Sequence, residues 1–196
     1  MNDPRIEHWL AAVLDTPGLT SIRDPVEASR VLLDESLAAV PHVAAALGPI
    51  IDVGSGGGAP GVPLALTFPD RLVTLLEANA RKAAFLERIA EDIPNLRVIR
   101  GRAEEQPVDT FGAAVARALA PPPIAAEWCL PLVRPGGITV LYVGPSADLE
   151  AVARVAALTG GGQPTRHDGV IVIPKLLPTP AGFPRRVGVA RKRPLA

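Results

Sequence analysis

A glycine-rich turn between an apolar strand and an apolar helix constrains the fold of this chain more than any other feature. Residues 50–61 read IIDVGSGGGAPG, in which positions 50–53 predict a short buried strand and positions 54, 56, 57 and 58 are glycine. The apolar stretch 62–66 then predicts a helix. Strand, glycine turn and helix in this order bring backbone N–H groups and a helix N-terminus to the carboxyl end of a parallel strand, where a nucleotide-like ligand can dock closely. The sequence therefore predicts a cofactor site at this turn.

Strands and helices alternate after the turn. The pattern predicts strands at 72–76, 96–100, 112–116, 138–143 and 170–173, and helices at 79–91, from the prolines at 121–123 to Leu132, and from Ser146 as N-cap to the glycines at 160–162. This alternation predicts a Rossmann-like, doubly wound α/β sheet that binds its ligand at the carboxyl ends of the strands.

Two helices are expected before the turn. Residues 3–16 carry apolar side chains at helical spacing. Asp24, Pro25 and Glu27 then supply an N-cap, a proline at the first helical position and an acid three residues after the cap. We expect one face of this second helix to hold Val26, Leu33, Leu37 and Val40.

Length and composition indicate a single structural domain. With 196 residues and 48% hydrophobic content, the chain can bury one sizeable core. Within it we expect a helical extension over 1–45, an α/β domain over 46–175 and a basic, proline-rich tail over 176–196.

Several classes of protein do not fit the composition. No apolar run approaches the roughly 20 residues of a membrane span, and the N-terminus MNDPRIEHWL lacks the pattern of a signal peptide. We therefore expect a soluble, cytoplasmic protein with no membrane partner. Cys129 is the single cysteine, and the three histidines are scattered with no carboxylate at ligand spacing. We expect neither a disulfide framework nor a metal site.

The charges are balanced in number but unevenly distributed. Twenty basic and twenty acidic residues argue against a strongly basic nucleic-acid binder. No acidic residue occurs from 170 to 196, whereas the basic residues there are Lys175, Arg185, Arg186, Arg191, Lys192 and Arg193. The tail is either a solvated end without a partner or a segment that contacts a phosphate backbone.

The acidic residue at the end of the second predicted strand narrows the choice of cofactor. Glu77 follows the glycines by roughly 20 residues, where such folds hold an adenosine ribose through its two hydroxyls, although Glu77 could instead cap a helix. Glycine turns of this kind serve NAD, FAD and S-adenosylmethionine. The chain has no room for the substrate domain of an NAD enzyme, which favours S-adenosylmethionine and the fold of class I methyltransferases.

A more specific resemblance extends from about Leu19 to Leu195. The motifs that carry it are TSIRDP at 20–25, DVGSGGGAPGVPL at 52–64, RKAAFL at 81–86, GRAEE at 101–105, ARALA at 116–120, CLPLVRPGG at 129–137 and PTPAGFPRRVGVARKRPL at 178–195. Together they resemble the bacterial 16S ribosomal RNA guanine-N7 methyltransferases, also called the glucose-inhibited division protein B family. The resemblance implies a class I fold, S-adenosylmethionine as cofactor, and 16S rRNA or the small ribosomal subunit as substrate. We separately expect a monomer, which the sequence does not settle.

The resemblance also implies roles for individual residues. For the cofactor they are Gly54, Gly56, Gly58 and Ala59 at the methionine part, Glu77, Ala78 and Asn79 at the ribose, Ala103 (backbone) and Glu104 (side chain) at the adenine, and Arg117 at the methyl-donor end, where it would also be the catalytic residue. For the RNA they are Arg81, Lys82, Arg185, Arg186, Arg191, Lys192 and Arg193.

The chain departs from the family pattern in three places. Residues 15–19 and 143–144 lack polar or cationic groups of the family, and the Arg-His-x-L-D-S-L pattern becomes RVLLDESL at 30–37, without the His and with an extra residue. Two alternatives to the family function therefore stay open. One is a divergent methyltransferase that acts on another RNA or on a small molecule, and the other is a non-catalytic RNA-binding or assembly protein.

Overall fold

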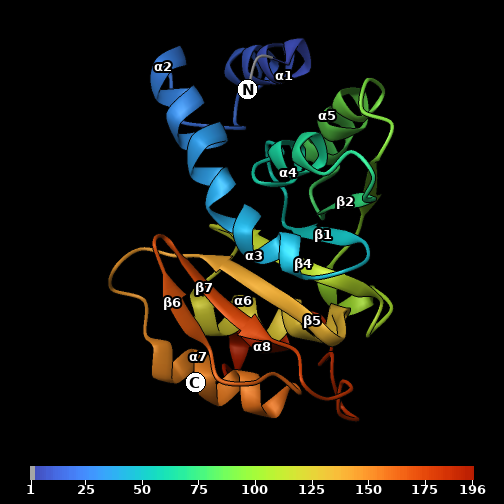
Figure 1. The fold of residues 1–196 in the computed structure, drawn as a ribbon, viewed down its shortest axis with the longest axis vertical. Coiled ribbons are helices and arrows are strands. Elements are labelled where there is room, and N and C mark those ends of the chain that lie inside the picture. The colour runs from blue at the N-terminus through green and yellow to red at the C-terminus, as the bar shows by residue number, and fades with distance from the viewer. Residues whose placement is uncertain (1–2) are drawn as a thin grey trace.

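A seven-stranded mixed sheet forms the centre of the computed structural model, which describes residues 3–196 (Figure 1). The strands are β1 (Ile50–Val53), β2 (Val73–Glu77), β3 (Leu96–Arg100), β4 (Phe111–Arg117), β5 (Val133–Tyr142), β6 (Thr165–His167) and β7 (Val170–Pro174). They lie in the order β3-β2-β1-β4-β5-β7-β6. The first five pair in parallel, and β7 runs antiparallel to β5 and β6. The strand order reverses direction next to β1, so the carboxyl end of β1 is the switch point where such sheets bind ligands.

Helices cover both faces of the sheet (Figure 1). They are α1 (Pro4–Asp15), α2 (Pro25–Ala28), α3 (Val40–Ala45), α4 (Gly61–Thr67), α5 (Ala80–Ala90), α6 (Pro122–Cys129), α7 (Leu149–Leu158) and α8 (Val189–Lys192). Shorter or wider turns are the π-helix η1 (Ser29–Asp34) and the 3₁₀ helices η2 (Glu35–Ala39), η3 (Ala103–Glu105) and η4 (Leu130–Leu132).

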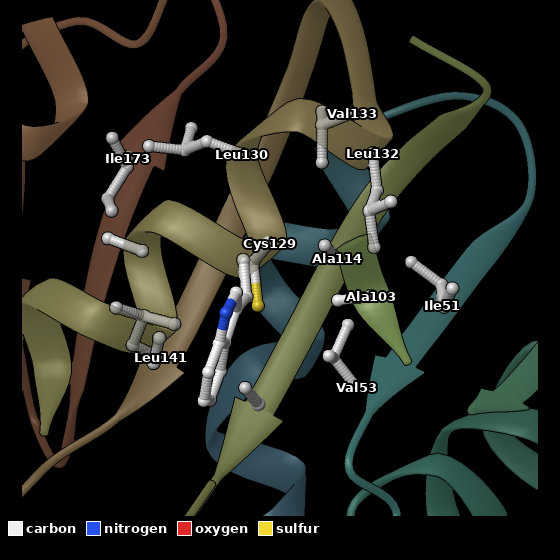
Figure 2. Packing of buried hydrophobic residues seen from close by; sticks show 14 of the residues in the cluster. Ile51, Val53, Ala103, Ala114, Cys129, Leu130, Leu132, Val133, Leu141 and Ile173 are labelled. Carbon is white, nitrogen blue, oxygen red and sulfur yellow. The ribbon is translucent and has the colours of Figure 1, made fainter. Parts of the chain in front are cut away.

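Alternate residues of each central strand point to opposite faces and build two cores. Ile50 packs with apolar side chains of α1, α3, α4 and α5. Ile51 and Val53 pack with those of α6, α7 and α8, where Cys129 is fully buried (Figure 2). Because both faces are covered, the central strands are mostly apolar, and β1 is apolar apart from Asp52, whereas the edge strand β3 carries exposed Arg97 and Arg100.

The segment from α2 to α3 differs from the single helix expected there. Asp24 caps it as expected, because its carboxylate accepts a hydrogen bond from the Glu27 N–H at 2.8 Å. The next turn is the π-helix η1, which contains about one residue more per turn than an α-helix. The residues that follow it therefore point in a different direction around the helix axis. The expected apolar face is confirmed only in part: Leu33 is buried and Leu37 and Val40 are half-buried, but Val26, which lies before η1, is 78% exposed. The buried face consists of Ala28, Leu33, Ser36, Ala39 and Val43.

Three smaller expectations also differ from the structure. The N-cap of α7 is Asp148, whose carboxylate accepts from the Ala151 N–H at 3.0 Å, and not Ser146. Strand β5 begins at Val133, five residues before the expected start. Strand β6 was not expected, because its three residues are all exposed and carry no apolar pattern.

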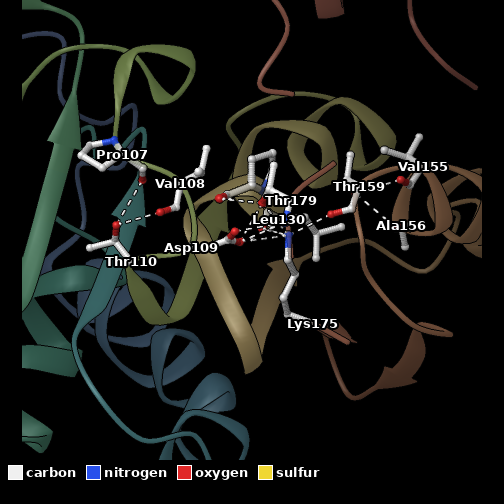
Figure 3. A network of polar contacts seen from close by, with 11 residues as sticks. Pro107, Val108, Asp109, Thr110, Leu130, Val155, Ala156, Thr159, Lys175 and Thr179 are labelled. Atoms are coloured by element: carbon white, nitrogen blue, oxygen red, sulfur yellow. Dashed lines mark hydrogen bonds and ion pairs between the residues drawn. The ribbon is translucent and has the colours of Figure 1, made fainter. Parts of the chain in front are cut away.

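The C-terminal tail is fixed to the domain through a buried lysine (Figure 3). The Lys175 ammonium, 0% exposed, donates to the carbonyl oxygens of Leu130 (3.0 Å) and Thr159 (2.8 Å) and to the Thr179 hydroxyl (2.8 Å). Asp109 accepts from the N–H and hydroxyl of Thr179 and lies 3.6 Å from the ammonium. All three protons of the buried cation are therefore satisfied, as burial of a charge requires.

Candidate functional site

The glycine turn after β1 brings backbone close to β2. The Gly54 and Ser55 N–H groups donate to the Leu76 carbonyl at 2.8 and 3.1 Å. Gly54 and Gly56 have φ of 74° and 57°, the left-handed region that favours glycine. A Cβ at Gly54 would collide with Leu119, whereas one at Gly56 would meet only the Gly54 carbonyl oxygen at 3.8 Å. Gly54 therefore allows the loop that carries Leu119 to approach closely, and Gly56 leaves open space in the cavity that it lines.

Glu77 closes this turn from the end of β2. One carboxylate oxygen accepts from the Gly56 N–H at 2.9 Å and the other from the Asn79 N–H at 2.7 Å, and the residue is 8% exposed. A carboxylate offers about four lone-pair sites, so two remain for the hydroxyls of a ribose. The alternative that Glu77 caps α5 does not hold, because the Asn79 carboxamide is the cap and accepts from the N–H groups of Arg81 and Lys82.

A cavity of about 310 Å³ opens beside Glu77. Its residues come from the glycine turn, the ends of β2 and β3, the loop after β4, helix α6 and the C-terminal segment: Val53, Gly54, Gly56, Leu76, Glu77, Ala78, Lys82, Gly101, Arg102, Ala103, Glu104, Ala118, Leu119, Trp128 and Arg191. Ala103 and Glu104 begin the short helix η3, where backbone N–H groups have no intrahelical acceptor. The cavity thus offers a carboxylate, backbone donors and an aromatic wall.

Two further cavities adjoin the first. One of about 210 Å³ shares Gly54 and Gly56 with it and adds Ala59 and Arg117. The other, of about 520 Å³, shares Arg117 with the second and is bounded by Tyr142 and the turn between β6 and β7. The cavities therefore form a path along the carboxyl edge of the sheet, from Glu77 to the far side of Arg117.

Arg117, the last residue of β4, is held between the second and third cavities. Its Nη1 donates to the Val31 carbonyl in the π-helix at 2.6 Å. Burial lowers the pKa of the guanidinium, and the nearby carboxylate of Asp52 opposes this shift. The Tyr142 hydroxyl donates to the Ser36 carbonyl in the same helical segment. Contacts with η1 and η2 thus hold the side chains of Arg117 and Tyr142, which both line the third cavity.

Asp52 lies beneath the turn, on the face covered by α4. It is 1% exposed; one carboxylate oxygen accepts from the Gly61 N–H at 3.1 Å, and within residues 3–196 the other has no hydrogen-bond partner. Burial raises the pKa of this carboxyl to about 7, against the opposing effects of the nearby Ser55 hydroxyl, the hydrogen bond from Gly61 and the Arg117 guanidinium. Asp52 lines none of the three cavities, so its carboxyl lies behind the turn rather than at the ligand surface.

These features fit the S-adenosylmethionine that the sequence resemblance implies. Gly54, Gly56, Glu77, Ala78, Ala103 and Glu104 line the first cavity, and Ala59 and Arg117 line the second. Two of the expected residues lie outside both linings: Gly58 packs against Val62 and Trp9, and Asn79 serves as the cap of α5. The sequence analysis missed Leu119 and Trp128, since an isolated apolar residue after a strand and an aromatic residue in a core helix carry no signal of their own.

The expected RNA-contacting cations have different surroundings. Arg81, Arg186, Arg191, Lys192 and Arg193 are exposed. Lys82 and Arg191 line the first cavity, and Arg185 makes a bidentate ion pair with buried Glu127, at 2.5 and 2.6 Å.

In the described part of the chain, no group of three or more His, Cys, Asp or Glu side chains is arranged to hold a metal ion. Nor does any helix within residues 3–196 have the length and apolar character needed to cross a membrane.

Comparison with known proteins finds one family. The family model for rRNA small subunit methyltransferase G (GidB) matches residues 8–164. A ribosomal RNA small subunit methyltransferase G from Synechococcus elongatus is 35% identical, over 96% of this chain and 86% of that protein. Those from Moorella thermoacetica and Roseiflexus castenholzii are 35% and 40% identical, over 97% and 74% of this chain and 89% and 70% of those proteins.

Solved structures with a similar fold include methyltransferases. A geranyl diphosphate C-methyltransferase from Streptomyces coelicolor has a TM-score of 0.61 at 14% identity, over 85% of this chain and 86% of that one. A 16S rRNA N2 G1207 methyltransferase from Thermus thermophilus, in complex with AdoMet and guanosine, has a TM-score of 0.52 at 19% identity, over 68% of this chain and 36% of that one. At these identities the likeness concerns the fold, which is that of class I methyltransferases.

Proposed function

The chain belongs to the rRNA small subunit methyltransferase G family, and from this membership we propose that it transfers a methyl group from S-adenosylmethionine to N7 of one guanine in 16S rRNA. The observation that carries the proposal is the path of adjoining cavities that runs from Glu77, past the glycine turn, to Arg117. Such a path suits a cofactor at one end and a nucleobase at the other. We further propose that the protein acts in the cytoplasm as a monomer.

The residues expected at the cofactor have separate tasks. S-Adenosylmethionine, when bound, supplies a methyl group on a positively charged sulfur. Glu77 would accept the two ribose hydroxyls, Ala103 and Glu104 would contact the adenine, and the glycines would admit the methionine part.

The reaction needs no strong base, which agrees with the residues near Arg117. Guanine N7 carries an in-plane lone pair and no proton, so the protein mainly has to hold nucleophile, methyl group and sulfur in line. Arg117 would hold the guanine or its phosphate, since a planar guanidinium suits either group. The third cavity, about 520 Å³, is large enough for a purine, and the ring of Tyr142 forms part of its wall.

The test is methyl transfer from labelled S-adenosylmethionine to small ribosomal subunits from cells that lack this modification. We expect label on a single guanine N7, mapped to one nucleotide. Naked 16S rRNA in parallel identifies the assembly state of the substrate. Binding of S-adenosylmethionine without label on either RNA would contradict the proposed substrate and favour a divergent methyltransferase, whereas absence of cofactor binding would favour an RNA-binding or assembly protein.

A further inference from the structure

The C-terminal segment 185–193 folds back over the adenosine end of the first cavity. The Gly188 N–H donates to a Glu104 carboxylate oxygen at 3.2 Å. Ala190 is 2% exposed and belongs to the core that includes α6. The Arg185–Glu127 ion pair and a hydrogen bond from Arg185 to the Arg193 carbonyl at 2.9 Å hold both ends of the segment. These contacts fix the segment against the folded domain.

Arg191 enters the cavity from this segment. Its guanidinium lies over the Trp128 ring, 5.3 Å from the ring centroid, and Nη2 donates to the Leu119 carbonyl at 3.4 Å. Arg191 and Trp128 line the same cavity as Ala103 and Glu104. A planar guanidinium has two faces, and only one of them can lie on Trp128.

We propose that Arg191 is a cofactor-binding residue that contacts the adenosine part of S-adenosylmethionine, and that cofactor binding thereby stabilises the docked C-terminal segment. The proposal rests on the proposed function, since it takes S-adenosylmethionine as the ligand. The contact depends on the flat guanidinium, because a purine offers an aromatic face to it. Charge alone does not serve this purpose, because S-adenosylmethionine itself carries a positive charge at sulfur. Glu104 connects the cofactor cavity to the C-terminal segment, because it lines the cavity and its carboxylate accepts a hydrogen bond from the Gly188 N–H.

Calorimetric binding of S-adenosylhomocysteine without RNA tests the contact. We expect Arg191→Ala to weaken binding about tenfold, as for loss of a cation–π contact, and Arg191→Lys to restore little of it because lysine lacks the planar group. Arg193→Ala and Arg193→Lys are the matched controls, since Arg193 is exposed and absent from the cavity lining, and both should bind as the unaltered protein does. Thermal unfolding checks that all variants are folded.

Trypsin tests the coupling, because it cleaves after the arginines and the lysine of this segment, except Arg193, which precedes Pro194. S-Adenosylhomocysteine should slow cleavage within 185–193 several-fold in the unaltered protein and in Arg193→Ala, but not in Arg191→Ala. Equal affinity and equal protection in Arg191→Ala and the unaltered protein would overturn the proposal, and so would full restoration of binding by Arg191→Lys. If the unaltered protein itself does not bind S-adenosylhomocysteine, the proposed function fails and not this inference alone.

Discussion

At the scale of single residues, the buried carboxyl of Asp52 should make stability depend on pH. In an unfolded chain this group titrates near its ordinary pKa of about 4, and in the folded protein its pKa is raised to about 7. Between these values the unfolded state loses a proton that the folded state keeps, so the free energy of unfolding falls as pH rises from 4 to 7 and then levels. The effect of this group is at most about 4 kcal/mol. Urea unfolding across this range should show a smaller decline for Asp52→Asn than for the unaltered protein, and parallel curves would contradict the assignment.

A second prediction at this scale separates substrate positioning from cofactor binding. Arg117 lines the second and third cavities but not the first. Arg117→Ala should therefore lower methyl transfer to rRNA about a hundredfold, as misalignment of reactants does, while affinity for S-adenosylhomocysteine changes by less than about threefold. Arg117→Lys retains the charge and should recover only part of the rate. A variant that methylates at the normal rate would exclude Arg117 from the reaction.

Single residues differed in how well the sequence predicted them. Glu77 was predictable because an acid after the second strand of such a sheet has a known use, and it lines the cavity as expected. Asp52 and Trp128 were not, because the unusual property of each arises from burial by distant elements. The tail cations gave one uniform signal in the sequence, although Arg185 is paired with Glu127 and Arg191 lines the cavity. A run of charges does not tell which members meet a partner within the fold.

At the scale of elements, Asn79 has a capping role that can be tested apart from any role at the ribose. Its carboxamide oxygen accepts from the first-turn N–H groups of Arg81 and Lys82, at 2.9 and 3.2 Å. Asn79→Ala should lower the free energy of unfolding by about 1 kcal/mol, whereas Asn79→Asp and Asn79→Ser, which can also cap, should change it little. If these two variants keep the cap but lose affinity for S-adenosylhomocysteine, the amide itself contacts the cofactor.

The ion pair between α6 and the C-terminal segment offers a second test at this scale. Arg185→Met would leave the Glu127 carboxylate, 3% exposed, without its partner and should cost about 3 kcal/mol in urea unfolding. The double variant Arg185→Met/Glu127→Met should cost less than Arg185→Met alone, because no uncompensated charge remains buried. Arg186→Met, at an exposed neighbouring position, should change stability by less than about 0.5 kcal/mol. If the effects of Arg185→Met and Glu127→Met, each measured alone, add up to the effect of the double variant, the two residues are not coupled.

The elements themselves were largely predictable, and the exceptions have a common cause. The strands that are buried on both faces and the helices with strong caps appeared in the sequence as apolar runs and capping residues. The sequence shows one residue more than the family pattern in 30–37, but it did not predict the π-helix η1 in this stretch, whose Val31 carbonyl accepts from Arg117. Local pattern fixes a helix, whereas its width and the face that it buries depend on what packs against it.

At the scale of the whole molecule, balanced charge has to be reconciled with an RNA substrate. The formal net charge is zero, so long-range attraction to a polyanion is weak and binding depends on where the cations lie. Among the tail cations, Arg186, Lys192 and Arg193 are exposed and lie outside the first cavity, whereas Arg191 is exposed but also lines that cavity. Segment 176–196 is fixed to the core through Lys175, Arg185 and Ala190. Truncation of the tail would therefore damage the cofactor site as well as the RNA contact, and cannot separate the two.

Replacing the charged side chains while keeping the tail intact separates the RNA contact from the cofactor site. The triple variant Arg186→Gln/Lys192→Gln/Arg193→Gln should weaken binding to the rRNA substrate and reduce the slope of log affinity against log salt by up to about 3, one for each lost phosphate contact. Its affinity for S-adenosylhomocysteine should stay unchanged, because none of the three lines the first cavity. A matched variant with three exposed cations replaced on β3 and α5, Arg88→Gln/Arg97→Gln/Arg100→Gln, carries the same change in net charge. Equal loss of RNA affinity in both would mean that only total charge matters, whereas a loss confined to the tail variant would identify the exposed tail as the RNA-contacting surface.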